Sequence, residues 1–269
     1  MERISKRKMP KFFVNKKQVE NETINIIGGD VNHIKNVLRK KEKEKIEICI
    51  IGNEEKGIDT ISEIEKIEEN CIKCRILEYK VSETEGKIQV TIFQGLPKSD
   101  KMELVIQKSV ELGVYEIYPT EMKRCIVKLK EQEANKKIAR WQKISEVAAK
   151  QSGRNIIPQI KEKVNIKQVC NLVKDYDKLI VAYEEEKENS LKSELKSIKS
   201  KDKENIKIAI LVGPEGGIDL EEIEELSKAG AVIVTLGKRI LRTETAGLTT
   251  LSILMYHLEC REQLDDKNI

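Results

Sequence analysis

Short runs of alternating hydrophobic and polar residues fill the first eighty positions of the chain. Because successive side chains of a strand point to opposite faces of a sheet, this period of two predicts β-strands. Apolar residues at helical spacing predict one short helix over 33–40. Together these elements predict a compact, barrel-like β domain. The predicted strands are 24–27, 46–51, 59–67 and 71–79.

A polar stretch over 81–86 precedes a different pattern, in which short apolar runs alternate with helical ones. That alternation is typical of an α/β domain with a parallel sheet. We therefore predict a β-rich domain over 1–80 and an α/β domain over 84–269. The charged segment 184–205 is open to two interpretations, a loop or a solvated helix. The predicted strands are 88–93, 115–119, 156–160, 178–182, 207–211 and 231–236, and the predicted helices are 101–112, 132–151, 166–173 and 244–260.

The last predicted helix, 244–260, carries apolar residues around most of its circumference. A helix of this kind is buried from several sides. In an element at the end of the chain, this pattern predicts burial by a partner subunit as well as by the sheet of its own subunit. We expect Leu248 and Leu251 to contribute to that subunit interface.

Two glycine-containing segments, 213–217 and 236–246, each follow an apolar run and precede a helical pattern. Open α/β sheets bind ligands at the carboxyl ends of their strands, so both segments are candidate binding loops. The first lacks the Lys and Ser/Thr that end a phosphate-binding loop. Asp219 and Glu222 predict an N-cap and its capping-box partner, which place carboxylates at the positive end of the next helix. A phosphate would be repelled there.

The chemistry of these loops favours a ligand with a purine or apolar body, little negative charge and a positive centre. S-adenosylmethionine has these properties. The chain contains no G-x-G-x-x-G, the sequence typical of dinucleotide-binding loops, so a dinucleotide is a poor candidate.

Composition narrows the class of protein further. Of the 269 residues 36% are charged, yet the formal net charge is only +4. This balance permits a nucleic-acid partner without requiring one, because binding depends on where cations cluster. Aromatic residues make up 4% of the chain, so the core must consist mainly of Ile, Leu and Val.

The six cysteines are mostly isolated within apolar patterns. Cys71 and Cys74 form one C-x-x-C, but no second pair or His cluster completes a zinc site. We therefore predict reduced core cysteines and no metal site. No apolar run reaches transmembrane length, and the basic start over 1–8 lacks the apolar region of a signal peptide. These features predict a cytoplasmic protein.

The two candidate loops, Gly213-Pro214-Glu215-Gly216-Gly217 and the segment 236–246, closely resemble those of the RsmE family. That family consists of bacterial 16S ribosomal RNA uridine-N3 methyltransferases of the SPOUT class. The segment 41–45 departs from the family, because it replaces a Gly-Asp turn that is common in the small domain. Further segments that are similar to the family are 12–14, His33 with 37–39, 94–102, 107–114, 140–144 and 151–158.

The resemblance implies a PUA-like, RNA-binding β-barrel over 1–80 and a methyltransferase domain over 84–269 with a deep trefoil knot. It also implies a homodimer that binds S-adenosylmethionine and acts on 16S rRNA in the small ribosomal subunit. No association with a membrane is implied. The residues that it assigns to cofactor binding are Ala182, Tyr183, Leu211, Gly213, Pro214, Glu215, Gly216, Leu236, Gly237, Ile240, Leu241 and Thr245.

N3 of uracil is a weakly acidic imide, so methyl transfer requires removal of its proton or stabilisation of the developing anion. An arginine beside the uracil carbonyls favours the anion, and Arg242 in the loop over 236–246 is our first candidate. Arg242 can alternatively hold the methionine carboxylate of the cofactor. Glu244 or a water is the candidate proton acceptor, although an acidic residue at the start of a helix equally suits a capping role.

N3 lies on the Watson–Crick edge of uracil, so the target base must be unpaired or extruded. Trp141 has Ile138 and Ile144 at helical spacing, which favours a place in the core over base stacking. Two alternatives remain open: an RNA-binding assembly factor without catalysis, and a SPOUT enzyme that modifies a tRNA or a 2′-hydroxyl. The candidate RNA contacts are Arg39, Lys98, Lys101, Arg124 and Arg154.

Overall fold

The computed structural model describes residues 9–52, 56–82, 84–198 and 206–265, with side chains described through 259. The chain divides into two compact units. The first comprises 1–85 together with 149–156, and the second comprises 86–148 and 157–269. Within the described ranges, no helix has the length and apolar character needed to cross a membrane.

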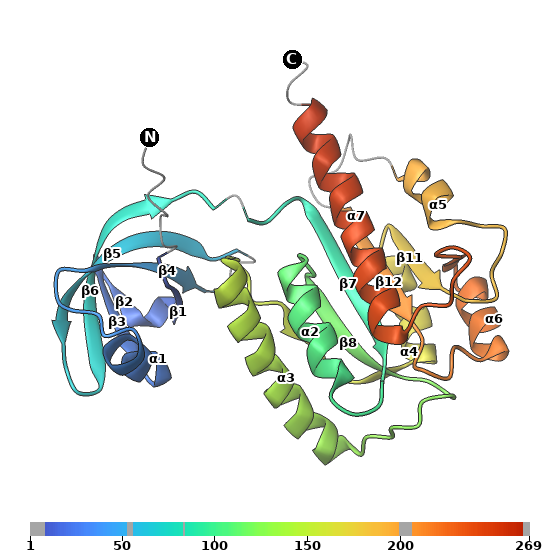
Figure 1. Cartoon of the computed structure of the whole chain (residues 1–269), viewed down its shortest axis with the longest axis horizontal. Coiled ribbons are helices and arrows are strands. Elements are labelled where there is room, and N and C mark those ends of the chain that lie inside the picture. The colour runs from blue at the N-terminus through green and yellow to red at the C-terminus, as the bar shows by residue number, and fades with distance from the viewer. Residues whose placement is uncertain (1–8, 53–55, 83, 199–205, 266–269) are drawn as a thin grey trace. The chain divides into compact units, whose positions relative to one another are not determined.

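The first unit is built on a strongly curled six-stranded sheet with the order β1-β4-β5-β6-β3-β2 (Figure 1). All neighbouring strands are antiparallel except β1 and β4, which run parallel. Its core consists mainly of isoleucines, in agreement with the low aromatic content of the chain. The strands are β1 (Lys11–Asn15), β2 (Val19–Glu20), β3 (Thr23–Ile27), β4 (Lys45–Ile51), β5 (Ile58–Ile67) and β6 (Cys71–Lys80).

Four of these strands confirm the sequence prediction, whereas β1 and the two-residue strand β2 were missed. Phe12, Phe13 and Val14 are all buried, so the strand shows no alternation from which its period could be recognised. The predicted helix over 33–40 begins earlier, as α1 (Gly29–Asn32), and continues as a π-helical turn over His33–Val37. It ends before Arg39, whose φ of 52° lies in the left-handed region and breaks the helix.

The second unit contains a seven-stranded sheet in which every pair of strands is parallel, which confirms the predicted α/β class. Its order is β10-β8-β7-β12-β11-β13, and β9 also pairs with β8. The strands are β7 (Ile88–Gly95), β8 (Glu116–Glu121), β9 (Gln159–Ile160), β10 (Val164–Asn165), β11 (Lys178–Ala182), β12 (Ile206–Val212) and β13 (Val232–Val234).

Helices cover this sheet. The last helix, α7, packs against β7, β12 and α2, and α4 packs against α6 (Figure 1). The last residues of α3 belong to the first unit. The helices are α2 (Lys101–Glu111), α3 (Glu131–Ser152), α4 (Ile166–Leu172), α5 (Leu191–Ser197), α6 (Leu220–Lys228) and α7 (Thr243–Asp265), with 3₁₀ turns over Lys16–Gln18 and Val173–Asp175.

The charged segment 184–205 contains a short helix. Ser190 caps α5 by accepting a hydrogen bond from the Ser193 N–H, and Leu191 and Leu195 are buried. The described part of the segment is therefore a loop followed by a helix that packs against the unit, so neither interpretation, a loop alone or a solvated helix, is correct as stated. Residues 199–205 lie outside the described part of the chain.

The burial of α7 is uneven. Leu251, Leu254 and Leu258 are fully buried within this subunit, whereas Ile253 is 40% and Tyr256 74% exposed. Its own sheet and α2 thus cover one face of the helix, and two large apolar side chains remain on the other. Because apolar residues are distributed evenly around this helix in the sequence, the pattern did not reveal which face is buried in the subunit and which is exposed.

Candidate functional site

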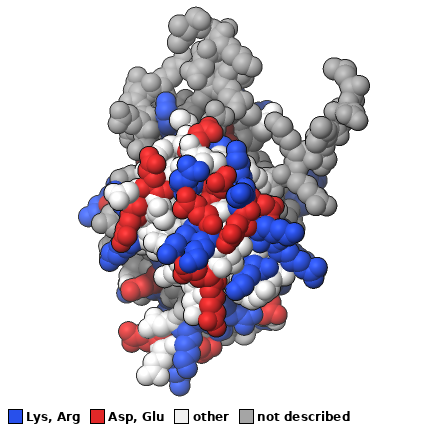
Figure 2. Space-filling view, turned by 90° about the vertical axis from the view of Figure 1, so that its left-hand side faces the viewer, with Lys and Arg blue, Asp and Glu red and all other residues white. Residues whose placement is uncertain are grey.

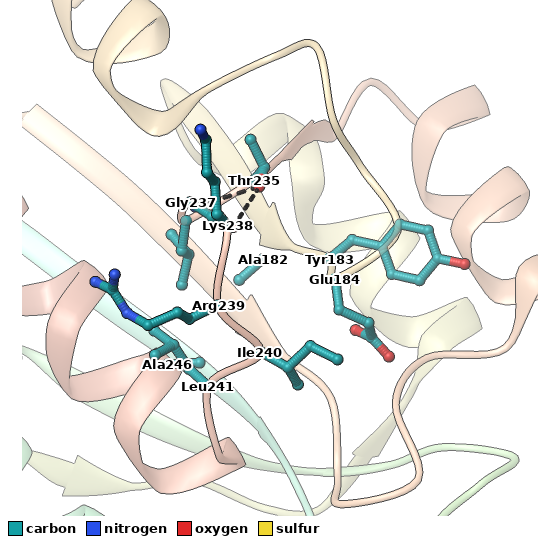
Figure 3. Close-up of a pocket in the computed structure, with 11 residues that line it drawn as sticks. Ala182, Tyr183, Glu184, Thr235, Gly237, Lys238, Arg239, Ile240, Leu241 and Ala246 are labelled. Atoms are coloured by element: carbon teal, nitrogen blue, oxygen red, sulfur yellow. Dashed lines mark hydrogen bonds between the residues drawn. The ribbon is translucent and has the colours of Figure 1, made fainter.

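The carboxyl ends of β11, β12 and β13 lie side by side, and the loops that follow them surround two adjoining hollows. We call these the first hollow and the second hollow. Figure 3 shows the first, with the Ile240 side chain pointing toward the side occupied by Glu184. The first hollow is lined by Ala182, Tyr183, Glu184, Thr235, Leu236, Gly237, Lys238, Arg239, Ile240, Leu241 and Ala246.

The second hollow shares part of its wall with the first, and it adds the loop after β12 and two cations, Lys101 and Arg242. The side chains common to both are Ala182, Glu184, Ile240, Leu241 and Ala246. The two hollows are therefore neighbouring parts of one site. The second is lined by Lys101, Ala182, Glu184, Val212, Gly213, Pro214, Glu215, Gly217, Ile240, Leu241, Arg242, Thr243 and Ala246.

Close backbone approach explains the glycines of the loop over 213–217. A Cβ on Gly213 would lie 2.7 Å from Cγ1 of Ile218, and one on Gly95 would lie 2.6 Å from the Pro214 nitrogen. Gly217 has a φ of +71°, and its N–H donates to the Pro214 carbonyl at 3.0 Å. Side chains at these positions would push the loop away from β7 and open the turn.

The helix that follows this loop, α6, has its N-terminus occupied by its own carboxylates, as the sequence predicted. The Asp219 carboxylate accepts a hydrogen bond from the Glu221 N–H at 3.3 Å, and the Glu222 carboxylate accepts from the Asp219 N–H at 3.3 Å. Glu222 also accepts from the Lys123 N–H at 2.9 Å. The positive end of the helix dipole is thus already neutralised, which makes it a poor phosphate site.

A buried chain of hydrogen bonds joins three segments of the site. The Gln94 amide Nε2 donates to Oγ1 of Thr243 at 2.8 Å, and that hydroxyl donates to the Gly213 carbonyl at 2.6 Å. The end of β7, the loop after β12 and the first turn of α7 are thereby held in register. Sequence reasoning missed this arrangement. The available signal was Gln94, a polar residue that directly continues an apolar strand.

An ionic cluster lies at the edge of the second hollow. Nζ of Lys101 is 3.0 Å from Oε1 of Glu215 and 3.4 Å from Oε2 of Glu244. The Glu215 carboxylate also accepts a hydrogen bond from the Lys98 N–H at 3.1 Å. The hydrogen bond to Glu215 raises the pKa of the Lys101 amine, so this group stays protonated. Lys101 therefore links α2 to the loop after β12 and to α7.

The two candidate catalytic residues lie in different surroundings. Arg242 is exposed and lines the second hollow, where its guanidinium can reach a ligand. The Glu244 side chain is only 15% exposed and lines neither hollow, and its carboxylate faces Lys101. A role for Glu244 as proton acceptor is therefore unsupported by its position.

Nine of the twelve residues predicted to bind the cofactor line one of the two hollows. Leu211 does not, because it is fully buried within β12. Thr245 is exposed outside both linings, and Gly216 lies against the backbone of Arg124. Wall residues that were not individually assigned to cofactor binding, although some lie in the predicted loops 213–217 and 236–246, are Glu184, Val212, Gly217, Thr235, Lys238, Arg239, Thr243 and Ala246.

Of the candidate RNA contacts, Arg39 and Lys98 have exposed side chains. Arg124 is also exposed, and its guanidinium is 3.4 Å from the Asp219 carboxylate and 3.5 Å from the Gly216 carbonyl. Lys101 takes part in the ionic cluster described above. Three of the five predicted cations therefore remain accessible to a large ligand.

The prediction for Arg154 is wrong. Its side chain is 6% exposed, and its guanidinium donates to the Glu85 carboxylate from Nε at 2.9 Å and from Nη2 at 2.6 Å. The Glu85 side chain is equally buried, with 7% of its surface exposed. A guanidinium enclosed in this way cannot contact an RNA phosphate. Its physical role is to neutralise a buried carboxylate within the first unit.

The charges on one side of the first unit are mixed. Figure 2 shows Lys and Arg side chains interspersed with Asp and Glu on this face, with no large area of a single sign. Among the described residues, no three His, Cys, Asp or Glu side chains are grouped to hold a metal ion. Burial raises the pKa of the Cys74 thiol to about 12, so this cysteine stays protonated at neutral pH.

Comparison with known proteins places these features in a family. Residues 84–255 match the RNA methyltransferase domain family. The chain is 37% identical to Ribosomal RNA small subunit methyltransferase E of Bacillus subtilis, over 93% of this chain and 98% of that protein. It is 36% identical to the protein of the same name from Mesomycoplasma hyopneumoniae, over 91% of this chain and 98% of that protein.

A solved structure extends the similarity to the fold. The Neisseria gonorrhoeae Ribosomal RNA small subunit methyltransferase E, bound to S-adenosyl methionine, is 32% identical to the chain, with a TM-score of 0.77. The match covers 91% of this chain and 96% of that one. Two glycine-lined loops at the carboxyl ends of parallel strands, a full-length sequence match and a shared fold lead to one conclusion: this chain belongs to the ribosomal RNA small subunit methyltransferase E family.

Proposed function

We propose that this protein transfers the methyl group of S-adenosylmethionine to N3 of a uridine in the 16S rRNA of the small ribosomal subunit. The observation that carries the proposal is the pair of hollows at the carboxyl ends of β11, β12 and β13. It occurs in a chain that is 32% identical to a protein solved with this cofactor. Because ribosomal subunits are the proposed substrate, we propose that the protein works in the cytoplasm.

The residues present fit this cofactor. The first hollow combines the backbone of 235–237 with Ile240 and Leu241, which suits an adenine ring that needs apolar contact and backbone hydrogen bonds. The second hollow carries the ammonium group of Lys101, which suits the methionine carboxylate. When bound, S-adenosylmethionine supplies an electrophilic methyl group on a sulfonium centre. The capped N-terminus of α6 disfavours phosphate-bearing ligands.

Arg242 is the proposed catalytic residue. Uracil gains negative charge on its carbonyl oxygens as N3 loses its proton, and a guanidinium at the wall of the second hollow stabilises that charge. The proton passes to solvent water, because the Glu244 carboxylate lines neither hollow and is paired with Lys101. The wall positions Ala182, Tyr183 and Gly213 to Glu215, together with 236–241, bind the cofactor in this proposal.

A trefoil knot in the second unit is supported by the hydrogen bonds around Thr235. Thr235 directly follows β13. On one side of β13, the Tyr183 N–H donates to the Val234 carbonyl at 3.0 Å. On the other side, the Thr235 N–H donates to the Asn189 carbonyl at 2.8 Å, and the Leu191 N–H donates to the Thr235 carbonyl at 3.2 Å. The segment 183–191 thus goes around the end of β13, and the chain that follows must pass this loop to reach α7. Such threading is rare in proteins.

The two units have different roles in this proposal. We propose that 1–80 forms a PUA-like domain that binds RNA, supported by its curled sheet and the exposed Arg39. Residues 84–269, except for 84–85 and 149–156, which belong to the first unit, form the methyltransferase domain, where Lys98 and Arg124 contact the RNA. The apolar Ile253 and Tyr256 on the exposed face of α7 support a homodimer.

A methyl-transfer assay tests the proposal. Purified protein is incubated with labelled cofactor and with small ribosomal subunits from a strain that lacks the modification, and the modified nucleotide is mapped. We expect label at N3 of one uridine. Label on a base carbon or on a ribose hydroxyl would contradict the substrate assignment, and binding of the cofactor without transfer would leave only an RNA-binding role.

A further inference from the structure

Glu184 lies two residues after the end of β11, and its carboxylate has no role in the methyl transfer proposed above. It is exposed and lines both hollows. Its side chain has no hydrogen bond or ion pair to any of the residues that the structure describes. Glu215, the other acidic residue on the described walls, is already bound by Lys98 and Lys101. Glu184 therefore offers acceptor atoms that a ligand can use.

The position of Glu184 within the site is specific. It belongs to the wall that the two hollows share, together with the apolar residues Ala182, Ile240 and Leu241. Figure 3 shows its carboxylate extended away from the Tyr183 ring, on the side of Ile240. A Cβ on Gly217 would collide with Oε1 of Glu184, so the bare backbone of Gly217 makes room for this carboxylate. The loop after β12 thus accommodates an acidic group at the junction of the hollows.

The order in which the parts of the cofactor are bonded to one another determines which part lies at this junction. In S-adenosylmethionine the ribose connects the adenine to the sulfur of the methionine part. If the first hollow holds the adenine and the second holds the methionine end, the ribose lies between them. Its two neighbouring hydroxyls are donors, and an ionised carboxylate presents two acceptor oxygens at matching spacing.

We propose that Glu184 binds the 2′- and 3′-hydroxyls of the cofactor ribose and thereby fixes the cofactor across the two hollows. This inference rests on the proposed function, because it takes S-adenosylmethionine as the ligand. Two other roles are open to a free carboxylate here: attraction of the sulfonium charge, and acceptance of the uracil proton. The location on the shared wall, between the cations of the second hollow and the backbone of 235–237, favours the ribose.

Titration calorimetry with the Glu184→Gln variant tests the proposal. The amide keeps the shape of the side chain but loses the charge and one acceptor, so we expect affinity to fall by about 10- to 100-fold. The loss should be equal for S-adenosylmethionine and for the product S-adenosylhomocysteine, because both contain the same ribose. Glu188→Gln is the matched control, since it removes the same charge from an exposed position in the same loop and should bind normally.

A second measurement targets the hydroxyls directly. Adenosine, 2′-deoxyadenosine and 3′-deoxyadenosine are compared as competitors of cofactor binding. We expect the wild type to prefer adenosine and the Glu184→Gln variant to lose that preference. An unchanged preference would overturn the proposal. So would weaker binding of S-adenosylmethionine with unchanged binding of S-adenosylhomocysteine, which would indicate recognition of the sulfonium charge.

Kinetics separate this role from catalysis and from the proposed function itself. For Glu184→Gln we expect the KM for the cofactor to rise while kcat largely persists. A large loss of kcat with normal cofactor affinity would make Glu184 the proton acceptor and overturn the ribose assignment. If the wild type binds the cofactor but does not methylate rRNA, the proposed function fails, while the hydroxyl test still decides the role of Glu184.

Discussion

Thr243 shows how one small side chain organises the site. Its hydroxyl accepts a hydrogen bond from Gln94 and donates one to the Gly213 carbonyl, and all of these atoms are buried. A buried donor or acceptor that loses its partner bears the full cost of desolvation. The loops around the two hollows are therefore preorganised by protein contacts before a ligand binds.

Replacing Thr243 with Val keeps the volume and removes both hydrogen bonds. We expect the free energy of unfolding to fall by about 1–3 kcal/mol, because the Gly213 carbonyl loses its donor and the Gln94 amide keeps only its hydrogen bond to the Gly95 carbonyl. Cofactor affinity should fall as well, since the loop over 213–217 loses its tie to α7. Urea denaturation and titration calorimetry measure the two effects. Thr249→Val, a change of the same kind elsewhere in α7, is the control, and equal effects in both variants would contradict the prediction.

Arg242 carries a separate prediction at the same scale. We expect Arg242→Ala to lower kcat roughly 100- to 1000-fold, the loss typical of removing a group that stabilises transition-state charge. RNA affinity should change little, because the remaining cations are unaffected. Single-turnover kinetics and filter binding provide the two numbers, and Arg242→Lys should recover part of the rate. Equal losses in turnover and in RNA affinity would exclude Arg242 from the chemistry.

At the scale of elements, the segment 149–156 is held in the first unit by buried charges. Nζ of Lys11 is 2.8 Å from Asp59 and donates to the Gly153 carbonyl at 3.2 Å. Arg154 pairs with Glu85 a residue later. The segment contains the last turn of α3 and the residues after it, and these contacts join it to residues that lie far away in the sequence. Paired buried charges are required here because an unpaired one is costly.

Removing one partner of such a pair leaves the other charge buried. We expect Arg154→Ala to destabilise the protein by about 3–5 kcal/mol, measured by urea denaturation. The exposed Arg124 is the contrasting position, and Arg124→Ala should weaken RNA binding with little change in stability. A stable Arg154→Ala protein with weakened RNA binding would restore Arg154 as an RNA contact.

At the scale of the whole molecule, α7 determines how the proposed dimer is best tested. Leu251 has no exposed surface in the single subunit, so replacing it with a charged residue would disrupt the fold. The exposed Ile253 and Tyr256 are the better positions. This corrects the expectation, drawn from the sequence alone, that Leu251 contributes to the interface.

We expect the double variant Ile253→Asp/Tyr256→Asp to be folded and monomeric, because two charges would have to be buried in the interface. Light scattering after size-exclusion chromatography gives the mass, and circular dichroism verifies the fold. The matched change Leu104→Asp, at an exposed apolar position on α2, tests whether the effect is specific to α7. A dimer that persists in the double variant would contradict the proposed interface.

Local patterns in the sequence determined most of the elements of this protein. The apolar runs and the cap formed by Asp219 and Glu222 depend on neighbouring residues and were predicted. The glycine loops and their suitability for S-adenosylmethionine came from the same local chemistry. Strand β1 escaped prediction because both of its faces are buried, which removes the alternation.

The tertiary structure alone decided which side chains meet. Gln94, Gly213 and Thr243 are far apart in the sequence, and only the parallel order of the strands brings them together. The tertiary structure also decided that Arg154 is buried, that Glu244 lines neither hollow and that the Glu184 carboxylate is left free. Exposure and pairing depend on contacts across the whole fold, so a single sequence carries little information about them.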